Sequence, residues 1–208
     1  MNAKINNIIF DFGGVILNLN ESLTNAALCK LIECESNELY EKLNSSNIFY
    51  DFECGKISPQ IFINHVKSIS AKPISDKQVV DAWNAMLLDF PQKHIELLLQ
   101  LKSKFRTFLL SNTNAIHEAA FTQNLINQSS RYTIYDMFEK VWYSHELGLR
   151  KPNHDIFLEV LSQANLKPEN TIFLDDRLDN ITAASEVGLH TIHITKENGI
   201  LQIFNEYL

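Results

Sequence analysis

The sequence predicts an α/β fold in which a parallel sheet carries helices on both faces and an all-helical block is inserted. Two observations predict this fold. Short apolar runs, of the kind found in strands buried on both faces, alternate with segments of helical periodicity. Between residues 20 and 88, every periodic segment is helical. Strands that alternate with helices indicate right-handed crossovers and a single parallel sheet.

The first predicted strand covers residues 8–10, which are all apolar or aromatic. Asp11 follows at the carboxyl end of this strand, and Gly13 with Gly14 favours a tight turn. Ligands in open α/β sheets bind just beyond the carboxyl ends of the strands. Asp11 is therefore a candidate nucleophile or metal ligand. Asp also serves turns and helix caps, so this stretch alone leaves that second interpretation open.

The helical block follows the first strand directly, and it divides the chain into two predicted domains. We expect residues 18–88 to form a helical cap domain, and residues 1–17 together with 89–208 to form the α/β core domain. Ser58 and Pro59 fit the N-cap and the first position of one helix in this block. The helices predicted here span residues 21–33, 59–69 and 75–86.

The remainder of the chain alternates helices and strands. A helix over residues 95–105 leads to the second strand, and a helix from about residue 115 leads to the third. Pro152 fits the first position of the next helix, and Gly188 fits the residue that ends the last one. The four further strands are predicted at residues 107–110, 141–143, 171–174 and 190–194.

Composition and charge narrow the class of protein. The chain has 208 residues, of which 45% are hydrophobic, and its net charge of -7 argues against a nucleic-acid-binding surface. No signal peptide is recognisable, and no run approaches the ~18 apolar residues that span a bilayer. The three cysteines lack metal-ligand spacing, so we expect reduced thiols rather than a zinc site. We therefore predict a cytoplasmic protein that binds neither nucleic acid nor membrane; its sequence carries no sign of an oligomeric state.

Polar residues of complementary chemistry follow the predicted strands. The carboxyl ends of parallel strands meet at one edge of the sheet, so these residues are expected to lie together. They offer a nucleophile, a hydroxyl, an amide, a cation and an acidic pair, which suit phosphoryl transfer. Carboxylate oxygens with a backbone carbonyl also suit Mg²⁺. The residues placed at this edge are Asp11, Ser111, Asn112, Lys151, Asp175 and Asp176.

Each of these residues also has a simpler interpretation. Ser111 could cap the following helix, and Lys151 could be a solvated surface charge. Asp175 and Asp176 could cap the helix after the fourth strand. These separate interpretations do not explain why all of the residues gather at the same edge of one sheet. The shared edge therefore favours a functional site.

The same segments resemble the motifs of the haloacid dehalogenase (HAD) superfamily, in order and over nearly the whole chain. The resemblance implies the Rossmann-like α/β core of the HAD fold, with the helical block as a type 1 cap. The matching segments are Phe10-Asp11-Phe12-Gly13-Gly14-Val15, Leu110-Ser111-Asn112, Arg150-Lys151-Pro152 and Leu174-Asp175-Asp176-Arg177-Leu178-Asp179.

More narrowly, the chain resembles a bacterial subgroup that contains an α-D-glucose-1-phosphate phosphatase. This resemblance implies a Mg²⁺-dependent phosphatase whose partner is a small phosphorylated metabolite, most simply a sugar phosphate. The stretches that carry it are Ser111-Asn112-Thr113-Asn114, Glu146-Leu147-Gly148-Leu149-Arg150-Lys151-Pro152, and Asp175-Asp176 with Asp179-Asn180.

The resemblance also implies a role for each site residue. Asp11 would attack phosphorus and form an aspartyl-phosphate, which is the covalent carboxylate route. Asp179 would orient Lys151 or cap its own helix. The implied Mg²⁺ ligands are Asp11, the Gly13 carbonyl, Asp175 and Asp176. The implied ligands of the phosphoryl oxygens are Ser111, the Asn112 backbone N–H and Lys151.

The sequence departs from the family pattern at Gly13. Most phosphatases of the superfamily carry there a second Asp, which protonates the leaving oxygen, and a positioned acid/base contributes about 10²–10⁴-fold in rate. Two alternatives follow from its absence. The chain could be a metal-independent 2-haloacid dehalogenase, whose halide needs no proton, or a catalytically silent phosphosugar-binding protein. The acidic pair Asp175 and Asp176 favours the metal-dependent phosphatase.

Residues of the helical block are candidates for setting specificity, because such lids close over the substrate. The aromatic members of this set could equally form the core of the block. His117 and His145 lie just past predicted strand ends, and we expect structural roles for them. Trp83 and Trp142 are assigned to packing. The residues predicted to face the site are Phe49, Tyr50, Phe52 and Glu53, near the turn at Gly55.

Overall fold

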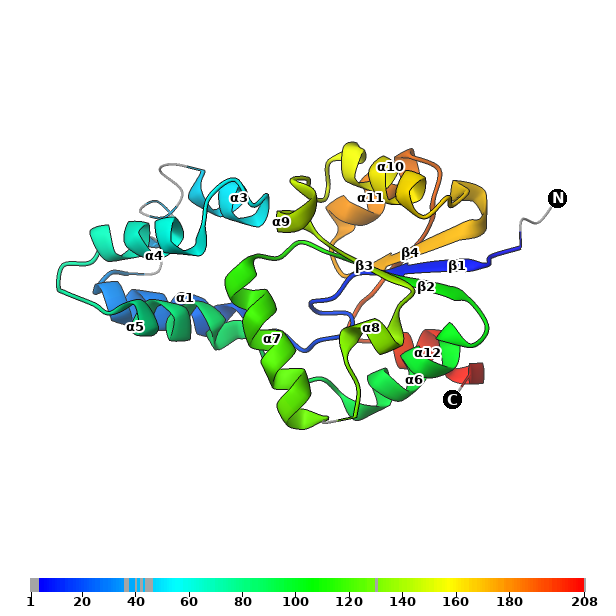
Figure 1. Ribbon diagram of the computed structural model, residues 1–208, viewed down its shortest axis with the longest axis horizontal. Coiled ribbons are helices and arrows are strands. Elements are labelled where there is room, and N and C mark those ends of the chain that lie inside the picture. The colour runs from blue at the N-terminus through cyan, green and yellow to red at the C-terminus, as the bar shows by residue number, and fades with distance from the viewer. Residues whose placement is uncertain are drawn as a thin grey trace.

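The computed structural model describes residues 4–35, 38, 39, 41, 43, 47–129 and 131–207. It consists of a parallel sheet with helices on both faces and a separate group of helices beside the carboxyl edge of that sheet (Figure 1). This arrangement confirms the predicted α/β fold with an inserted helical block. No helix in the described ranges is both long and apolar enough to cross a membrane.

The sheet has five parallel strands in the order β3-β2-β1-β4-β5. All four residues of β1 are buried, because this strand lies at the centre of the sheet. Ile8 and Phe10 pack into the core on one face, whereas Ile9 packs into the core on the other. The strands are β1 (Asn7–Phe10), β2 (Arg106–Ser111), β3 (Lys140–Tyr143), β4 (Thr171–Asp175) and β5 (His190–His193).

Two layers of helices cover the sheet. In Figure 1, α10 (His154–Gln163) and α11 (Leu178–Glu186) lie on one face. The opposite face is covered by α6 (Gln92–Lys102), α8 (Ile134–Met137) and α12 (Ile200–Ile203). Further core elements are α7 (Ala115–Gln128), α9 (Ser144–Leu147), η2 (Pro168–Asn170) and η3 (Asn205–Tyr207). The apolar faces of these helices and the two faces of the strands form the two halves of the core.

The inserted helices form a unit, called here the helical insert, around a separate hydrophobic cluster, to which Ile116 of α7 also contributes. Phe62 and Val66 are fully buried in it and pack with Leu28 and Val79. Ser58 caps α4 (Pro59–Ser68), as predicted: its side chain accepts a hydrogen bond from the backbone N–H of Ile61. The described elements are α1 (Glu21–Ile32), α3 (Ile48–Glu53), α4 (Pro59–Ser68), α5 (Asp76–Trp83) and η1 (Asn84–Met86).

The chain leaves and re-enters the core side by side. Leu19 and Leu87 form an antiparallel bridge between the two connecting segments. Backbone hydrogen bonds join Asn18 to Asp89 (3.1 Å) and Leu88 to Asn18 (3.0 Å). These contacts were not predicted from the sequence, because the segments are separated by the whole helical insert.

One predicted helix start was wrong, and one alternative helix cap is absent. The helix expected from Pro152 begins at His154, because residues 150–153 first form a turn in which the Asn153 N–H donates to the Arg150 carbonyl (3.1 Å). Ser111 does not cap the following helix. Asn114 does, since its side-chain oxygen accepts from the N–H groups of Ile116 and His117. Ser111 is thereby left available for another role.

Candidate active site

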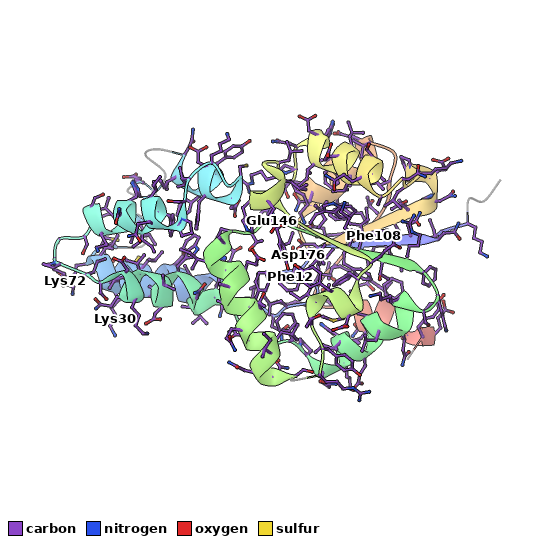
Figure 2. All side chains as sticks on the ribbon, in the orientation of Figure 1. Phe12, Lys30, Lys72, Phe108, Glu146 and Asp176 are labelled. Atoms are coloured by element: carbon purple, nitrogen blue, oxygen red, sulfur yellow. The ribbon has the colours of Figure 1, made fainter. Side chains whose placement is uncertain are left out.

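Three polar residues of the predicted site lie at the ends of three adjacent strands. Asp11 follows β1, Ser111 ends β2 and Asp175 ends β4, and in the register Phe10 pairs with both Leu109 and Leu174. Their exposed fractions are 8%, 3% and 0%. In Figure 2, Asp176 is labelled at this edge of the sheet, on the side that faces the helical insert. The predicted gathering at one sheet edge is therefore present for these strand-end residues.

Lys151 is the central cation of this cluster. Its side chain is only 1% exposed, and its Nζ donates to Asp11 Oδ1 (2.6 Å) and to Asp175 Oδ2 (2.7 Å). A third hydrogen bond goes to the Leu110 carbonyl (3.0 Å). All three ammonium protons therefore have a partner. The alternative interpretation of Lys151 as a solvated surface charge is wrong.

Asn112 fixes the backbone of Lys151. The Asn112 amide donates to the Lys151 carbonyl (2.8 Å), and its oxygen accepts from the Lys151 N–H (2.9 Å). This reciprocal pair holds the segment before α10 against the end of β2. Asn112 therefore has a role that the sequence did not reveal, in addition to the predicted use of its backbone N–H.

Asp175 is held by the start of α11. The Asn180 amide lies 3.0 and 2.9 Å from its two oxygens, and the Arg177 N–H donates to Oδ1 (2.8 Å). Asn180 is itself buried. Asp179 contacts neither Lys151 nor Asp175, because it pairs with Arg177 at 2.9 Å. Of the two roles predicted for Asp179, orienting Lys151 is not supported, whereas its Oδ1 accepts from the Asn180 N–H (2.9 Å) in the first turn of its own helix. The contact of the Asn180 side chain with Asp175 was not predicted.

Burial and charge act against each other in the cluster. The pKa of Asp11 is raised to about 7: burial raises it most, Lys151 lowers it, and the charge of Asp175 raises it. Burial also opposes the charge of Lys151, but the two carboxylates outweigh it and raise the lysine pKa. The cluster therefore contains one buried cation and two buried carboxylates. A metal cation would offset the excess of negative charge that remains.

The acidic residues are arranged as a set of hard oxygen ligands. One carboxylate oxygen each from Asp11, Asp175 and Asp176 lie within 4.8 Å of one another. Burial and the charge of Asp175 raise the pKa of Asp176, as expected for crowded carboxylates. Oxygen-only donors of this kind suit Mg²⁺, so the residues present fit the predicted metal. Gly14 permits the approach: its φ is +75°, and a Cβ there would lie 2.4 Å from Asp176 Oδ2.

Leu19 fills the space beside Gly13. A Cβ built on Gly13 would lie 2.3 Å from Leu19 Cδ1. An apolar side chain from the segment that enters the helical insert therefore stands where an acid/base side chain would otherwise extend. At the position where most phosphatases of the superfamily carry an acid/base Asp, this chain therefore has Gly13 in contact with Leu19.

We expect Gly13→Asp to lower activity rather than raise it. The new side chain would displace Leu19 and would add a carboxylate beside an already acidic cluster, with a loss of about 1–3 kcal/mol in the free energy of unfolding. Thermal unfolding and steady-state rates measure both effects. Adding Leu19→Ala should recover stability. A tenfold gain in activity from Gly13→Asp alone would contradict this account.

The structure gives packing roles to His117, Phe49 and Phe52, as the simpler interpretation expected. His117 is buried, its Nε2 lies 3.1 Å from the Trp83 carbonyl, and the two rings stack at 5.0 Å. The Phe49 ring also stacks with the Trp83 ring, with 5.4 Å between the ring centres. Phe52 is 2% exposed and packs on Phe62. The predictions that Phe49 and Phe52 face the site are not supported, because both belong to the core of the helical insert.

The burial of His117 predicts a pH dependence of stability. Burial lowers its pKa from 6.5 to about 4. Below pH 6.5 the unfolded chain therefore binds a proton at His117, whereas the folded protein binds it only near pH 4. Because the unfolded state binds more protons in this range, the free energy of unfolding decreases as the pH falls. Between pH 7.5 and 5 the loss from this group is about 2 kcal/mol. Urea unfolding at both pH values should show it in the native protein. His117→Gln should show a smaller loss, and equal losses in both proteins would refute the assignment.

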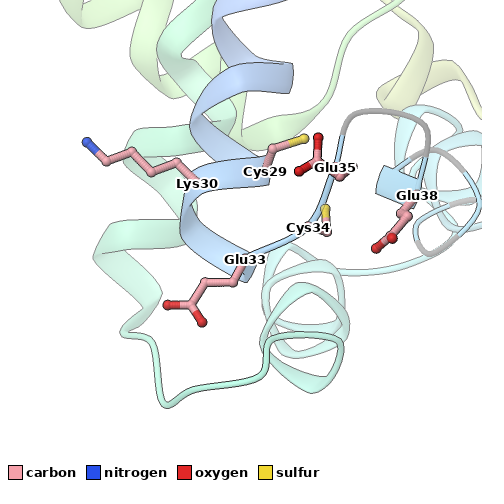
Figure 3. A pocket seen from close by; sticks show the side chains of 6 residues that line it. All are labelled: Cys29, Lys30, Glu33, Cys34, Glu35 and Glu38. Carbon is pink, nitrogen blue, oxygen red and sulfur yellow. The ribbon is translucent and has the colours of Figure 1, made fainter.

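Two other features of the surface were not part of the predicted site. Glu118, His145 and Glu146 form a second cluster, in which His145 Nε2 lies 3.1 Å from Glu118 Oε2. A hollow of about 400 Å³ opens on the helical insert (Figure 3). None of its lining residues is a predicted site residue: they are Cys29, Lys30, Glu33, Cys34, Glu35 and Glu38.

Comparison with known proteins identifies the family. The model of the haloacid dehalogenase-like hydrolases matches residues 8–194, which include every site residue named above. The chain is a haloacid dehalogenase-like hydrolase. The predicted superfamily is thus confirmed, and the buried Asp11–Lys151–Asp175 cluster of this hydrolase lies within the matched region.

Relatives of this hydrolase cover almost its whole length. A D-ribitol-5-phosphate phosphatase of Bacteroides thetaiotaomicron is 27% identical over 195 residues, which is 94% of this chain and 93% of that protein. A HAD family enzyme of the same organism, solved with magnesium and inorganic phosphate, is 33% identical over 96% of this chain and 99% of its own, with a TM-score of 0.87. A predicted HAD-like hydrolase of Porphyromonas gingivalis is 32% identical over 98% of each chain, with a TM-score of 0.86.

The dehalogenase alternative receives support from the fold alone. An L-2-haloacid dehalogenase of Xanthobacter autotrophicus has a TM-score of 0.60, but it is only 13% identical over 93% of this chain and 80% of its own. Similarity at this level is shared by proteins of one fold with different activities. The hydrolase therefore shares an architecture with dehalogenases, whereas its more similar relative of known activity is a phosphatase.

Proposed function

We propose that this hydrolase is a Mg²⁺-dependent phosphatase of small sugar or polyol phosphates. The observation that carries the proposal is the buried Lys151 ammonium between Asp11 and Asp175, with Asp176 beside them. One edge of the sheet thereby offers a nucleophile, a phosphate-binding cation and oxygen ligands for a metal. The enzyme class and the magnesium cofactor predicted from the sequence agree with the phosphatase relative and the magnesium-bound structure.

The phosphorylated polyols are the first substrates to test. The relative that acts on D-ribitol 5-phosphate aligns over nearly all of both chains. α-D-Glucose 1-phosphate is the second candidate, because the sequence resembles the subgroup that contains such a phosphatase. Both are phosphate monoesters of hydroxylated carbon chains, so the same site chemistry serves either one.

We further propose that the helical insert is a type 1 cap comprising residues 18–88, on a core of residues 1–17 and 89–208. Two observations support this division. The insert packs around a separate hydrophobic cluster, and its connecting segments pair with each other at Leu19 and Leu87. The paired connecting segments are the covalent link between the two units, and other contacts, such as that of Trp83 with His117, join their surfaces.

In the proposed reaction, an oxygen of Asp11 attacks phosphorus, the ester bond breaks, and an aspartyl-phosphate forms. Water then attacks this intermediate, inorganic phosphate leaves and the Asp11 carboxylate is restored. Lys151, Ser111 and the Asn112 N–H would hold the phosphoryl oxygens. Asp11, the Gly13 carbonyl, Asp175 and Asp176 would hold Mg²⁺, which supplies positive charge against the phosphate. Since Leu19 fills the space beside Gly13, the leaving oxygen would take its proton from water or from a substrate hydroxyl.

The test is phosphate release from a panel that includes D-ribitol 5-phosphate, α-D-glucose 1-phosphate and p-nitrophenyl phosphate, with Mg²⁺ and with EDTA. We expect turnover only with the metal and a preference for one of the hydroxylated esters. Halide release from L-2-chloropropionate without metal would instead support a dehalogenase. Phosphosugar binding without turnover of any ester would support a silent binding protein. Either result would overturn the proposal.

A further inference from the structure

We propose that Glu53 and Arg150 are positioning residues that couple the cap to Lys151, an inference that rests on the proposed phosphatase function. Glu53 ends α3 in the cap, and Arg150 directly precedes Lys151 in the core. Their ion pair joins Glu53 Oε2 to Arg150 Nη2 at 3.0 Å. It therefore links a cap helix to the residue next to the buried ammonium.

The surroundings of Glu53 place it over the site rather than on an outer surface. Its side chain is 28% exposed and that of Arg150 is 29% exposed, so the pair is largely shielded from water. Burial raises the pKa of Glu53, while the positive charges of Arg150, Arg177 and Lys151 oppose this rise. Two of these cations adjoin site residues in the chain, because Arg150 precedes Lys151 and Arg177 follows Asp176. Through its contact with Arg150, Glu53 therefore reaches the segment that carries a proposed phosphate ligand.

Two further contacts dock the same cap turn on the core. Gly55 has a φ of +65°, and a Cβ there would lie 2.0 Å from the His145 carbonyl oxygen, so only glycine allows this approach. The Arg150 guanidinium lies 5.5 Å from the centre of the Tyr50 ring. α3 and α9 also lie side by side in Figure 1. The end of α3 is therefore seated on the core segment that leads to Lys151.

Lys151 is consequently held from two sides. The core holds its backbone through the two hydrogen bonds of Asn112 (2.8 and 2.9 Å). The cap holds the preceding residue through Glu53. Arg150 Nε is buried and has no hydrogen-bond partner within the described residues. Among those residues, Glu53 is the carboxylate that forms an ion pair with the Arg150 guanidinium. Withdrawal of the cap would remove one of the two supports of the Lys151 segment.

This arrangement makes a distinctive prediction about substrates. Lys151 is proposed to bind the phosphoryl group, which every substrate of the enzyme contains. A defect transmitted through Lys151 should therefore be independent of the leaving group. A residue that contacts the leaving group directly would instead affect large substrates and spare small ones.

The experiment compares Glu53→Gln, Arg150→Gln and the double variant on the best ester of the panel and on acetyl phosphate. We expect kcat/KM to fall about tenfold in each single variant, and equally for both substrates. The double variant should be no worse than either single one, because the two residues act as a unit. Lys77→Gln is the matched control, since Lys77 also lies in the cap but is 83% exposed and pairs only with Asp81 of its own helix among the described ion pairs, at 2.6 Å.

A second measurement does not require turnover. Inorganic phosphate with Mg²⁺ should raise the Tm of the native protein more than that of Glu53→Gln or Arg150→Gln. A loss confined to the large ester would show that Glu53 contacts the leaving group, and additive losses or unchanged kinetics would also overturn the coupling. These failures differ from failure of the proposed function, in which the native protein itself releases no phosphate from any ester.

Discussion

Asp11→Asn is expected to abolish Mg²⁺-dependent phosphate release, with a loss of at least about 10³-fold in kcat. The amide has nearly the shape of the carboxylate, but it cannot attack phosphorus. The substitution also removes one of two buried carboxylates that share the Lys151 ammonium at 2.6 and 2.7 Å. The free energy of unfolding should therefore stay the same or rise, because the excess negative charge of the cluster falls. Initial rates and urea unfolding of the same preparations test both statements.

The matched control is Asp81→Asn, which alters a surface ion pair with Lys77, where Asp81 is 60% exposed. This control should keep the native rate and stability, because exposed pairs contribute little. Intact mass spectrometry of Asp11→Asn should be recorded before and after the assay, since deamidation would regenerate the native residue. More than a tenth of the native rate in a verified Asp11→Asn preparation would rule out Asp11 as the nucleophile.

The sequence was sufficient to predict the fold and the positions of the residues at the strand ends. Apolar runs indicated the buried strands, and the rule that ligands bind at carboxyl ends placed Asp11, Ser111 and Asp175 together. These inferences succeed because they depend on local patterns and on one general property of parallel sheets. The start of the helix at residue 152 was placed wrongly for the same reason: a local proline signal was applied to a turn that tertiary contacts shape.

The contacts of the site depend on residues that are distant in the sequence. Lys151 is separated from Asp11 by 140 positions, so its burial could not be told from the usual solvated state of a lysine. Leu19, which lies against Gly13, also forms a bridge with Leu87, 68 positions further along the chain. The contact of Asn180 with Asp175 could have been predicted from local sequence. Asn180 lies five residues after Asp175, on the first turn of a helix that starts at the same sheet edge.

Lys151→Met is expected to impair both activity and stability. Met has a similar length but no charge, so Asp11 and Asp175 would lose the cation that lies within 2.7 Å of both. Breaking a buried pair in this way costs about 3–5 kcal/mol, which lowers the Tm of a chain of this size by roughly 6–20 °C. Because Lys151 is a proposed phosphate ligand, its loss should lower kcat/KM by at least about 10²-fold. Thermal unfolding and steady-state kinetics measure the two effects.

Mg²⁺ and pH should each offset the loss of stability in Lys151→Met. The cation would bind the oxygens of Asp11, Asp175 and Asp176, which lie within 4.8 Å of one another, so Mg²⁺ should raise the Tm of the variant more than that of the native protein. Acidification should also narrow the difference, because protonated carboxyls need no counter-charge. Lys77→Met, at a side chain 83% exposed, is the control and should change neither Tm nor rate. If Lys151→Met were as stable as the native protein in EDTA at pH 8, the buried ammonium would not be the charge that balances this cluster.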